Sequence, residues 1–234
     1  MSATSQPESG QFRQIASWRH FAVVVAIVLA VAVRGFLAQS SRNPTANVNH
    51  TILYVSLIAM EGALIFLVWR GIRATGTTLR DLIGGRWKSA RDVLGDLAIA
   101  IALWLALIGI AAAWQLLSGD REVPGLVSAI LPRAPAEIVL WIAVSITAGA
   151  AEEIVFRGYC QRQLEALTGN AWIAMLLQAI LFGVSHGYQG VAAMLRITVL
   201  GLAFGLVAVT RRSLRPGILA HAWTDIASGV LRSG

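Results

Sequence analysis

The residues best able to do chemistry in this chain are two adjacent glutamates, Glu152 and Glu153, with Arg157 four positions later. An ionised glutamate is costly in hydrocarbon, so a membrane segment keeps one where a partner or a reaction holds it. On a helix, Glu153 and Arg157 share a face at i,i+4, while Glu152 points elsewhere. We predict an internal Glu153–Arg157 ion pair that leaves Glu152 free to take a proton from water. Alternatively, both acids lie at a helix end among headgroups and water.

Later apolar segments carry further polar side chains, namely His186, His221 and Asp225. The chain has four histidines, and the other two, His20 and His50, lie at the edges of apolar segments. His221 and Asp225 are spaced i,i+4 and therefore face the same way along one helix. A carboxylate one turn from an imidazole can orient it, hold it protonated or share a cation with it. Each histidine alone fits a satisfied core position, but together they favour a shared, water-filled site.

The composition is that of an integral membrane protein. The chain has 234 residues, of which 56% are hydrophobic and 13% charged, whereas soluble domains carry about 25% charged residues. A net charge of +7 could indicate nucleic acid, but the basic residues gather between apolar spans, as positive-inside orientation produces. We expect membrane lipid and a membrane-associated protein or peptide as partners, and no nucleic acid. The single cysteine, Cys160, excludes an internal disulfide and any cysteine-only metal site.

The hydropathy pattern predicts an all-α fold, a polytopic transmembrane helical bundle of about seven spans. The expected spans are 18–38, 51–69, 97–117, a glutamate-bearing helix from about 136, 171–185, 191–210 and 218–231. With a cytoplasmic N-terminus, 13 of the 19 Lys and Arg residues fall in cytoplasmic segments, which is the positive-inside arrangement. We therefore expect a multi-pass protein of the cell inner (plasma) membrane.

Three regions follow from this pattern. Residues 1–17 are polar and are expected to form a disordered tail. Residues 18–135 form N-terminal transmembrane helices, and they include a basic segment, 70–96, that alternates apolar and basic groups as an interfacial helix does. Residues 136–231 hold the acidic and histidine residues described above. Within them, Gly201 and Gly205 have the small-xxx-small spacing that predicts close helix packing.

Other ionisable residues leave a second class of function open. Glu61 lies in the middle of the second span and can pair with Arg34 or Arg196, a structural role that we favour over a substrate role. Such residues also mark ion pathways, so the alternative is a non-enzymatic binding or immunity protein or a small transporter. Transporters often show inverted repeats, whereas this sequence has no internal repeat and its charges concentrate late.

Whether Glu152 and His186 can meet depends on how deep each residue lies in the membrane. If the fifth span runs straight outward from Ala171, His186 lies roughly 22 Å along its axis, at about 1.5 Å per residue. Glu152 would then lie near the opposite membrane face. Convergence requires the glutamate helix to continue past Arg157, or a tilted fifth helix that starts deep. Hydropathy leaves both arrangements open.

Three motifs in order resemble the CAAX prenyl protease type II and bacteriocin-immunity (Abi, CPBP) family of intramembrane proteases. The family pattern is Glu-Glu-x-x-x-Arg, then Phe-x-x-x-His, then His-x-x-x-Asn or Asp. In this chain the motifs read Glu152-Glu153-Ile-Val-Phe-Arg157, Phe182-Gly-Val-Ser-His186 and His221-Ala-Trp-Thr-Asp225. The resemblance covers about residues 137–231, and it identifies 136–231 as CAAX-protease-like catalytic helices.

The resemblance implies an intramembrane endopeptidase that hydrolyses a peptide bond of a membrane-associated protein or peptide. A prenylated CAAX protein is the family's eukaryotic association, and bacterial relatives are linked to peptide maturation and immunity. The resemblance implies that Glu152 and His186 activate the water and that His221 and Asp225 stabilise the transition state. Glu153 and Arg157 would support the helix. The substrate-binding residues stay unknown.

One departure from the family pattern bears on mechanism. Asp225 stands where the family often has Asn, and an ionised aspartate would repel an oxyanion. Asp225 is therefore protonated, orients His221 or binds a cation. We favour a glutamate-type mechanism without a cofactor. The alternative is a Zn²⁺ site in which Glu152 or Asp225, with His186 and His221, ligates the metal, although the chain has no His-Glu-x-x-His signature.

Overall fold

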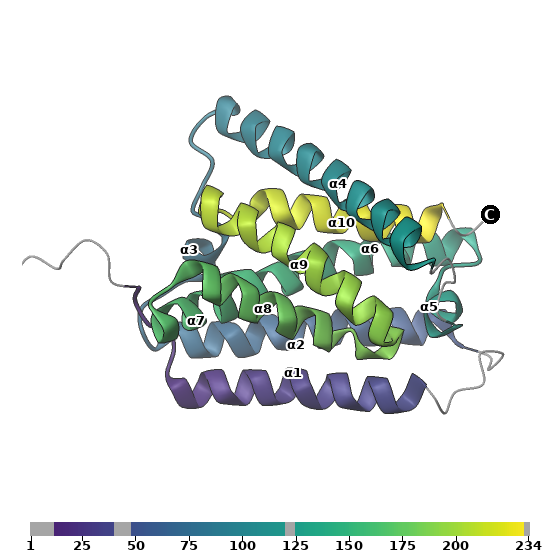
Figure 1. Cartoon of the computed structure of the whole chain (residues 1–234), viewed down its shortest axis with the longest axis horizontal. Coiled ribbons are helices and arrows are strands. Elements are labelled where there is room, and N and C mark those ends of the chain that lie inside the picture. Colours follow the sequence, from purple (N-terminus) through teal and green to yellow (C-terminus); the bar gives the residue numbers. More distant parts are fainter. Residues whose placement is uncertain (1–11, 40–47, 120–124, 232–234) are drawn as a thin grey trace, which may run out of the picture.

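The computed structural model describes residues 12–39, 48–119 and 125–231, and every regular element in these ranges is a helix (Figure 1). The all-helical prediction is thus confirmed for this part of the chain. The elements in order are α1 (Trp18–Gln39), α2 (His50–Arg73), α3 (Leu79–Ile83), α4 (Ala90–Ser118), α5 (Gly125–Ile130), α6 (Pro135–Glu152), the π-helix η1 (Glu153–Cys160), α7 (Gln161–Thr168), α8 (Ala171–Ser185), the 3₁₀ turn η2 (Gly187–Gln189), α9 (Val191–Arg211) and α10 (Arg215–Val230).

Several helices are long enough to cross a bilayer, which makes this a multi-pass membrane protein. By length and composition, five helical segments in the described ranges qualify: 18–39, 50–73, 90–118, 135–168 and 191–211. The sequence predicted about seven spans. The two others coincide with α8 and α10, which have 15 and 16 residues, whereas a helix needs about 20 residues to cross the hydrocarbon. The count of seven and the cytoplasmic N-terminus therefore stay predictions.

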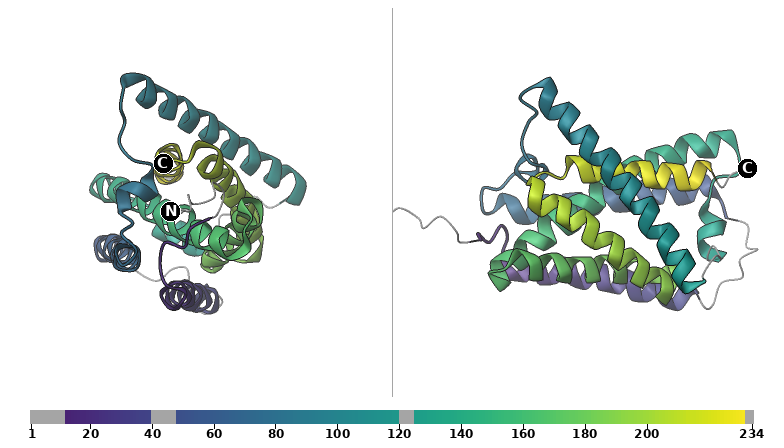
Figure 2. Two further views of the ribbon diagram at one scale, coloured as in Figure 1. Left: turned by 90° about the vertical axis from the view of Figure 1, so that its left-hand side faces the viewer. Right: turned by 45° about the horizontal axis from the view of Figure 1, so that its top comes forward.

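The helix that bears the glutamates lies at the centre of the bundle. In the most apolar stretch of the segment 135–168, half of the residues are buried. In the most apolar stretches of α1, α2 and α4, the buried share is 17%. Helix α2 packs along one side of α6 and α10 along another. Helix α1 lies at one outer edge, and α4 crosses the opposite edge at an angle (Figures 1 and 2). The outer helices thus face lipid and shield the central one.

The central helix does not end at the charged motif. It runs through α6, η1 and α7 as one helical segment, 135–168, and ends where Gly169 adopts a left-handed φ of 65° and its N–H bonds the Glu165 carbonyl. Asn170 then caps the start of α8. Of the two arrangements that would let the motifs meet, the continuing glutamate helix is the one observed. Glu152 lies near the middle of this helix, about 26 Å from its start at 1.5 Å per residue.

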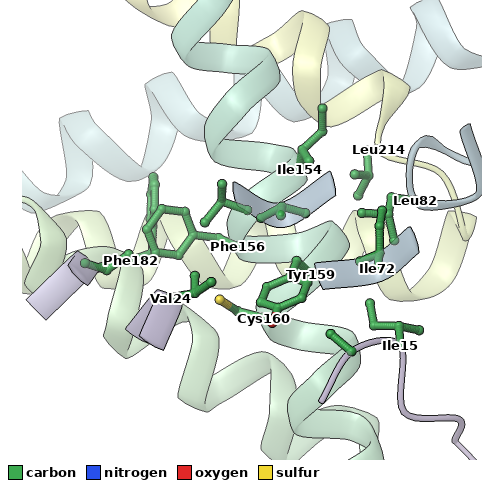
Figure 3. Close-up of a cluster of buried hydrophobic side chains, with 14 of the residues drawn as sticks. Ile15, Val24, Ile72, Leu82, Ile154, Phe156, Tyr159, Cys160, Phe182 and Leu214 are labelled. Carbon is green, nitrogen blue, oxygen red and sulfur yellow. The ribbon is translucent and has the colours of Figure 1, made fainter. Parts of the chain in front are cut away.

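The π-helix η1 is enclosed on all sides. All eight of its residues are buried, and a π-helix changes the direction in which successive side chains point relative to an α-helix. Its apolar side chains, including Ile154, Phe156 and Tyr159, pack against Val24 of α1 and Ile72 of α2 (Figure 3). The motif is therefore held by contacts with the N-terminal helices as well as by its own hydrogen bonds.

Close backbone approaches bring α8 against α9. A side chain at Gly183 would collide with Thr198 and the Met194 carbonyl of α9, and one at Gly201 would come within 3.3 Å of Ala179. One at Gly205 would meet Gln178 and Met175 of α8. The close packing predicted from the Gly201–Gly205 spacing is confirmed.

The polar segment before α1 is tied to the end of the central helix. The Gln163 amide oxygen accepts from the backbone N–H groups of Ile15 and Ala16 at 2.7 and 3.1 Å, and its nitrogen donates to the Ala16 carbonyl. Of the expected disordered tail, residues 1–11 lie outside the described ranges. Residues 15 and 16 are instead held in place, because a buried glutamine satisfies their backbone groups.

The basic segment 70–96 contains the end of α2, the short helix α3 and the start of α4 rather than one long interfacial helix. In α3 the Thr78 hydroxyl and N–H donate to the Asp81 carboxylate at 2.7 and 2.8 Å, and these hydrogen bonds hold the pKa of Asp81 below its usual range. The buried Leu82 side chain packs where Gly158 of η1 offers no side chain. The segment thus braces the central helix.

Candidate active site

The four residues predicted to do chemistry converge. Glu152 ends α6, His186 follows α8, and His221 and Asp225 lie on α10. The distance from Glu152 Oε2 to His186 Nε2 is 3.9 Å, and to His221 Nε2 it is 3.6 Å. His221 Nε2 lies 3.8 Å from Asp225 Oδ2. Segments up to 73 residues apart in the sequence therefore meet around one carboxylate oxygen.

Glu152 Oε2 is buried and has no hydrogen-bond partner among the described residues. The side chain as a whole is 21% exposed, and that of Asp225 is 34% exposed. A buried acceptor without a partner is costly, so this oxygen is available to a donor from a ligand or a water.

The tautomer of His186 follows from its surroundings. Its Nδ1 lies 2.9 Å from the Phe182 carbonyl oxygen, which can only accept, so Nδ1 carries a proton and donates. The Ser185 hydroxyl donates to the same carbonyl at 2.7 Å and so leaves this assignment unchanged. In the neutral ring, Nε2 therefore presents a lone pair on the side that faces Glu152.

The predicted ion pair between Glu153 and Arg157 is present. Arg157 Nη1 donates to Glu153 Oε1 at 2.9 Å, and Nη2 donates to the Gly201 carbonyl at 3.3 Å. Both side chains are fully buried. The guanidinium lies over the rings of Phe182 and Phe204, at 4.1 and 4.9 Å from their centroids. Cation–π contacts of this kind strengthen in a desolvated site.

Glu153 has a second role that sequence reasoning missed. His221 Nδ1 donates to Glu153 Oε1 at 3.2 Å, so the same carboxylate oxygen orients the imidazole of α10. The approach is possible because Gly217 of α10 has no side chain, and a Cβ there would lie 2.9 Å from Glu153 Oε2. No local spacing signals this contact, because the two residues are 68 positions apart.

Asp225 does not hydrogen-bond to His221, since 3.8 Å exceeds hydrogen-bond length. Its backbone carbonyl accepts from Trp141 Nε1 at 2.9 Å, which ties α10 to α6. The orienting role considered for Asp225 thus falls to Glu153. The Asp225 carboxyl still lies within ion-pair distance of His221 Nε2.

Glu61 belongs to this region as well. It is 6% exposed, and its Oε2 is buried without a hydrogen-bond partner among the described residues. Neither arginine expected as its partner forms an ion pair with it in the described ranges. Instead Glu61 interacts electrostatically with Glu152, His221 and Asp225. The structural Glu61–arginine pair suggested by the sequence is therefore not seen among the described residues.

Side chains in the described ranges do not group into a metal centre: no cluster of three or more His, Cys, Asp or Glu residues is arranged to hold an ion. Zinc binds nitrogen and oxygen ligands at about 2.0–2.2 Å in a tetrahedral set. The Nδ1 atom of each imidazole is engaged, at Phe182 and at Glu153, as is usual for histidines that ligate a metal through Nε2. The zinc ligand set considered from the sequence therefore stays an alternative.

Comparison with protein families decides what these motifs belong to. Residues 134–227 match the family described as type II CAAX prenyl endopeptidase Rce1-like. This stretch, which is less than half of the chain, is similar to that family. The match confirms the family resemblance drawn from the three motifs, and it contains Glu152, His186, His221 and Asp225. No curated protein and no solved structure gave a match.

The Rce1-like region corresponds to α6 through most of α10. The helices before it, α1 to α5, lie outside the match. They nevertheless support this region, since side chains of α1 and α2 pack against η1. The family points to CAAX-type intramembrane proteolysis, and the site contains a carboxylate and two imidazoles suited to it.

Proposed function

We propose that this chain is an intramembrane endopeptidase that hydrolyses a peptide bond of a membrane-associated protein or peptide, with water activated by Glu152. The observation that carries the proposal is the convergence of the His186 and His221 Nε2 atoms on the unpartnered Glu152 Oε2, at 3.9 and 3.6 Å. A water about 2.8 Å from each of these atoms can bridge groups at such separations. The Rce1-like match supports the reaction class.

Two acceptors would fix the orientation of the attacking water. The Glu152 carboxylate and the lone pair of His186 Nε2 each accept one water hydrogen, so an oxygen lone pair is left to face the scissile carbonyl. As the water oxygen bonds to the carbonyl carbon, its proton passes to Glu152. His186 keeps its orientation through the Phe182 carbonyl.

The negative charge of the tetrahedral intermediate would be met by His221. In the protonated ring, Nδ1 donates to Glu153 and Nε2 donates to the developing oxyanion. A carboxylic acid at Asp225 could donate in the same way, as an asparagine would at this position. Collapse of the intermediate breaks the C–N bond, and Glu152 returns its proton to the leaving amine.

Phe182 and Arg157 would hold the machinery at this depth of the membrane. The Phe182 ring touches the Arg157 guanidinium and lies 4.8 and 6.0 Å from the rings of His186 and His221. The Glu153–Arg157 pair thereby fixes Phe182 and His221 together. We assign Glu153 and Arg157 a positioning role.

The proposal also includes the membrane location of the protein and the organisation of the chain into regions. Residues 136–231 form the catalytic part, and 18–135 the supporting helices with their basic segment 70–96. Helices α8 and α10 would complete seven spans, with the N-terminus cytoplasmic by the distribution of Lys and Arg, in a cell inner membrane. The partners are lipid and the peptide substrate, of which prenylated CAAX proteins are one class.

The mechanism proposed needs no cofactor, and the zinc alternative is tested by metal analysis. The purified protein is expected to hold well under one zinc per chain and to keep its activity after chelation. One tightly bound zinc per chain, with activity lost on its removal and restored on its return, would move the reaction to a metal-bound water.

The reaction itself is tested with the wild-type protein in proteoliposomes. Single-span peptides, with and without a prenylated C-terminal segment, are incubated in H₂¹⁸O and analysed by mass spectrometry. We expect cleavage at a defined bond, with one ¹⁸O in the new C-terminal carboxyl group. The Glu152→Gln protein, purified identically, should show no cleavage, whereas Glu165→Gln, a neutralised carboxylate on α7, should match the wild type. A folded wild-type protein that cleaves no peptide would favour a binding or transport role.

A further inference from the structure

A cavity of about 390 Å³ lies at one end of the bundle, outside the site described above. The end of α3, the loop after it and the first residue of α10 line it, with the side chains or backbone of Ile83, Gly85, Arg86, Trp87 and Arg215. The start of α4 and the end of α9 lie at the same end of the bundle (Figures 1 and 2). Both helices are long and apolar enough to cross a bilayer, so their ends meet the headgroup layer. The cavity is therefore at the level of the lipid headgroups.

The backbone around this cavity is fixed against the turn between α9 and α10. The Leu214 N–H donates to the Ile83 carbonyl at 3.0 Å, and the Ser213 hydroxyl donates to the same oxygen at 3.3 Å. Gly84 has a left-handed φ of 103°, and a Cβ there would lie 2.8 Å from the Ser213 Cα. Gly85 follows with a φ of 78°. Glycine is favoured at both positions because other residues rarely adopt these angles, and the loop is thereby held in one conformation.

Arg215 is held in position by partners on several sides. Its Nε lies 2.9 Å from Asp96 Oδ2, and its Nη1 donates to the Gly85 carbonyl at 3.4 Å. Its guanidinium lies over the Trp87 ring, 5.0 Å from the centroid, and Trp87 Nε1 donates to Asp96 Oδ2 at 2.8 Å. These contacts leave Nη2 unused, and the side chain is 15% exposed. A cation fixed in this way loses little conformational entropy when an anion binds to it.

The charge around the cavity is strongly positive. Residues 84–96 and 211–215 hold six basic and two acidic residues, a surplus of four positive charges. One of the acids, Asp92, caps the start of α4 with its carboxylate. The other, Asp96, is buried and is shared between two guanidinium groups. Arg86 is exposed and forms no ion pair among the described residues. The lining of the cavity therefore carries positive charge that the surrounding acids do not offset.

We propose that this cavity binds the phosphate headgroup of an anionic phospholipid, with Arg215 and Arg86 contacting the phosphate and Trp87 and Ile83 contacting the glycerol and the first acyl carbons. Guanidinium groups bind phosphate oxygens through paired N–H donors, and basic pockets between membrane helices bind anionic headgroups. Trp87 is 47% exposed, and exposed tryptophans are typical of the membrane–water interface. The exposed ring favours a lipid over a soluble phosphate compound. The inference does not depend on the proposed reaction.

The site is tested by lipid binding to the purified full-length protein in detergent micelles. Native mass spectrometry follows the lipid retained by the protein as dioleoylphosphatidylglycerol or dioleoylphosphatidylcholine is added. We expect saturable binding of phosphatidylglycerol, with an affinity about tenfold above that for phosphatidylcholine, because one or two basic residues act on the headgroup charge. Equal binding of the two lipids would overturn the proposal. This comparison uses the wild-type protein and does not depend on the folding of any variant.

Variants show whether the cavity is the site. Arg86→Gln should weaken binding of phosphatidylglycerol about fivefold, the scale of one basic residue beside an anionic headgroup, whereas Arg86→Lys keeps the charge and should bind like the wild type. Arg73→Gln is the matched control. Arg73 lies over the Trp69 ring at 4.8 Å, at the end of α2, and does not line the cavity, so this variant should also bind like the wild type. Equal weakening by Arg86→Gln and Arg73→Gln would indicate diffuse attraction by the basic residues and would overturn the site.

A competition measurement separates a lipid from a soluble ligand. Glycerol phosphate, the headgroup phosphate without acyl chains, is added to the wild-type protein that holds phosphatidylglycerol. At a concentration equal to that of the lipid it should displace none, because it lacks the apolar carbons that contact Trp87 and Ile83. Displacement of the lipid by glycerol phosphate would overturn the lipid assignment and indicate a site for a soluble phosphate compound.

Discussion

The two sides of the central helix at its charged motif are built in opposite ways. Glu153 is fully buried, and its Oε1 bonds both Arg157 at 2.9 Å and His221 at 3.2 Å. Glu152, its neighbour in sequence, is 21% exposed and faces two imidazoles at 3.6 and 3.9 Å, beyond hydrogen-bond length. The Glu153 carboxylate is thus hydrogen-bonded to two partners, whereas Glu152 Oε2 has no hydrogen-bond partner among the described residues.

The difference teaches how one motif can serve both stability and reaction. A carboxylate whose partners are complete resists change, because removing any partner leaves a buried charge. A carboxylate without complete partners costs stability but is ready to accept a donor. Glu153 also shapes the surroundings of Glu152, because it orients the His221 ring that faces Glu152.

The largest effect on folding is expected at the buried pair of Glu153 and Arg157. Glu153→Gln leaves the Arg157 charge buried without its partner and should lower the free energy of unfolding by about 3–5 kcal/mol. Combining Glu153→Gln with Arg157→Met removes both charges and should restore part of this loss. Thermal and denaturant unfolding in detergent measure both variants. Equal stability of Glu153→Gln and wild type would contradict the division between the two sides.

A smaller loss is expected where α8 meets α9 just before His186. Gly183→Ala forces its new methyl group against Thr198 and the Met194 carbonyl and should cost about 1–3 kcal/mol through overpacking. Gly109→Ala on α4 is the matched control, because nothing lies within 4 Å of its Cβ, and it should be neutral or slightly stabilising. A Gly183→Ala protein as stable as the control would show that the two helices can separate freely here.

The smallest effect should come from the tether of the N-terminal segment. Gln163→Ala removes the partner of the Ile15 and Ala16 backbone groups and should cost about 1–2 kcal/mol, with peptidase activity within about twofold of wild type. Limited proteolysis should cut near residues 13–16 faster in this variant. Unchanged proteolysis would mean that other contacts hold the segment.

Local spacing in the sequence predicted the parts of this site that depend on one helix. The i,i+4 rule gave the Glu153–Arg157 pair, and the three motifs gave the residues that meet around Glu152. Hydropathy gave the all-helical class and most helix positions. These features follow from the chain's own periodicity, which is fully written in the sequence.

Contacts between distant helices could not be predicted in this way. The bond from His221 to Glu153 depends on the absence of a side chain at Gly217. The place of Glu61 depends on the register of α2 on α6, which the pairs at His50 and Tyr54 set. The π-helical turn after Glu152 likewise comes from packing rather than from propensity.

The central claim, that Glu152 reacts while Glu153 supports, is tested most directly by measuring turnover per folded molecule for Glu152→Gln. Peptide hydrolysis and thermal unfolding are followed on one preparation. We predict turnover lower by about a thousandfold, the scale of general acid–base catalysis, with an unfolding temperature close to that of wild type. Turnover that survives in Glu152→Gln, or that falls only in proportion to the folded fraction, would contradict the account.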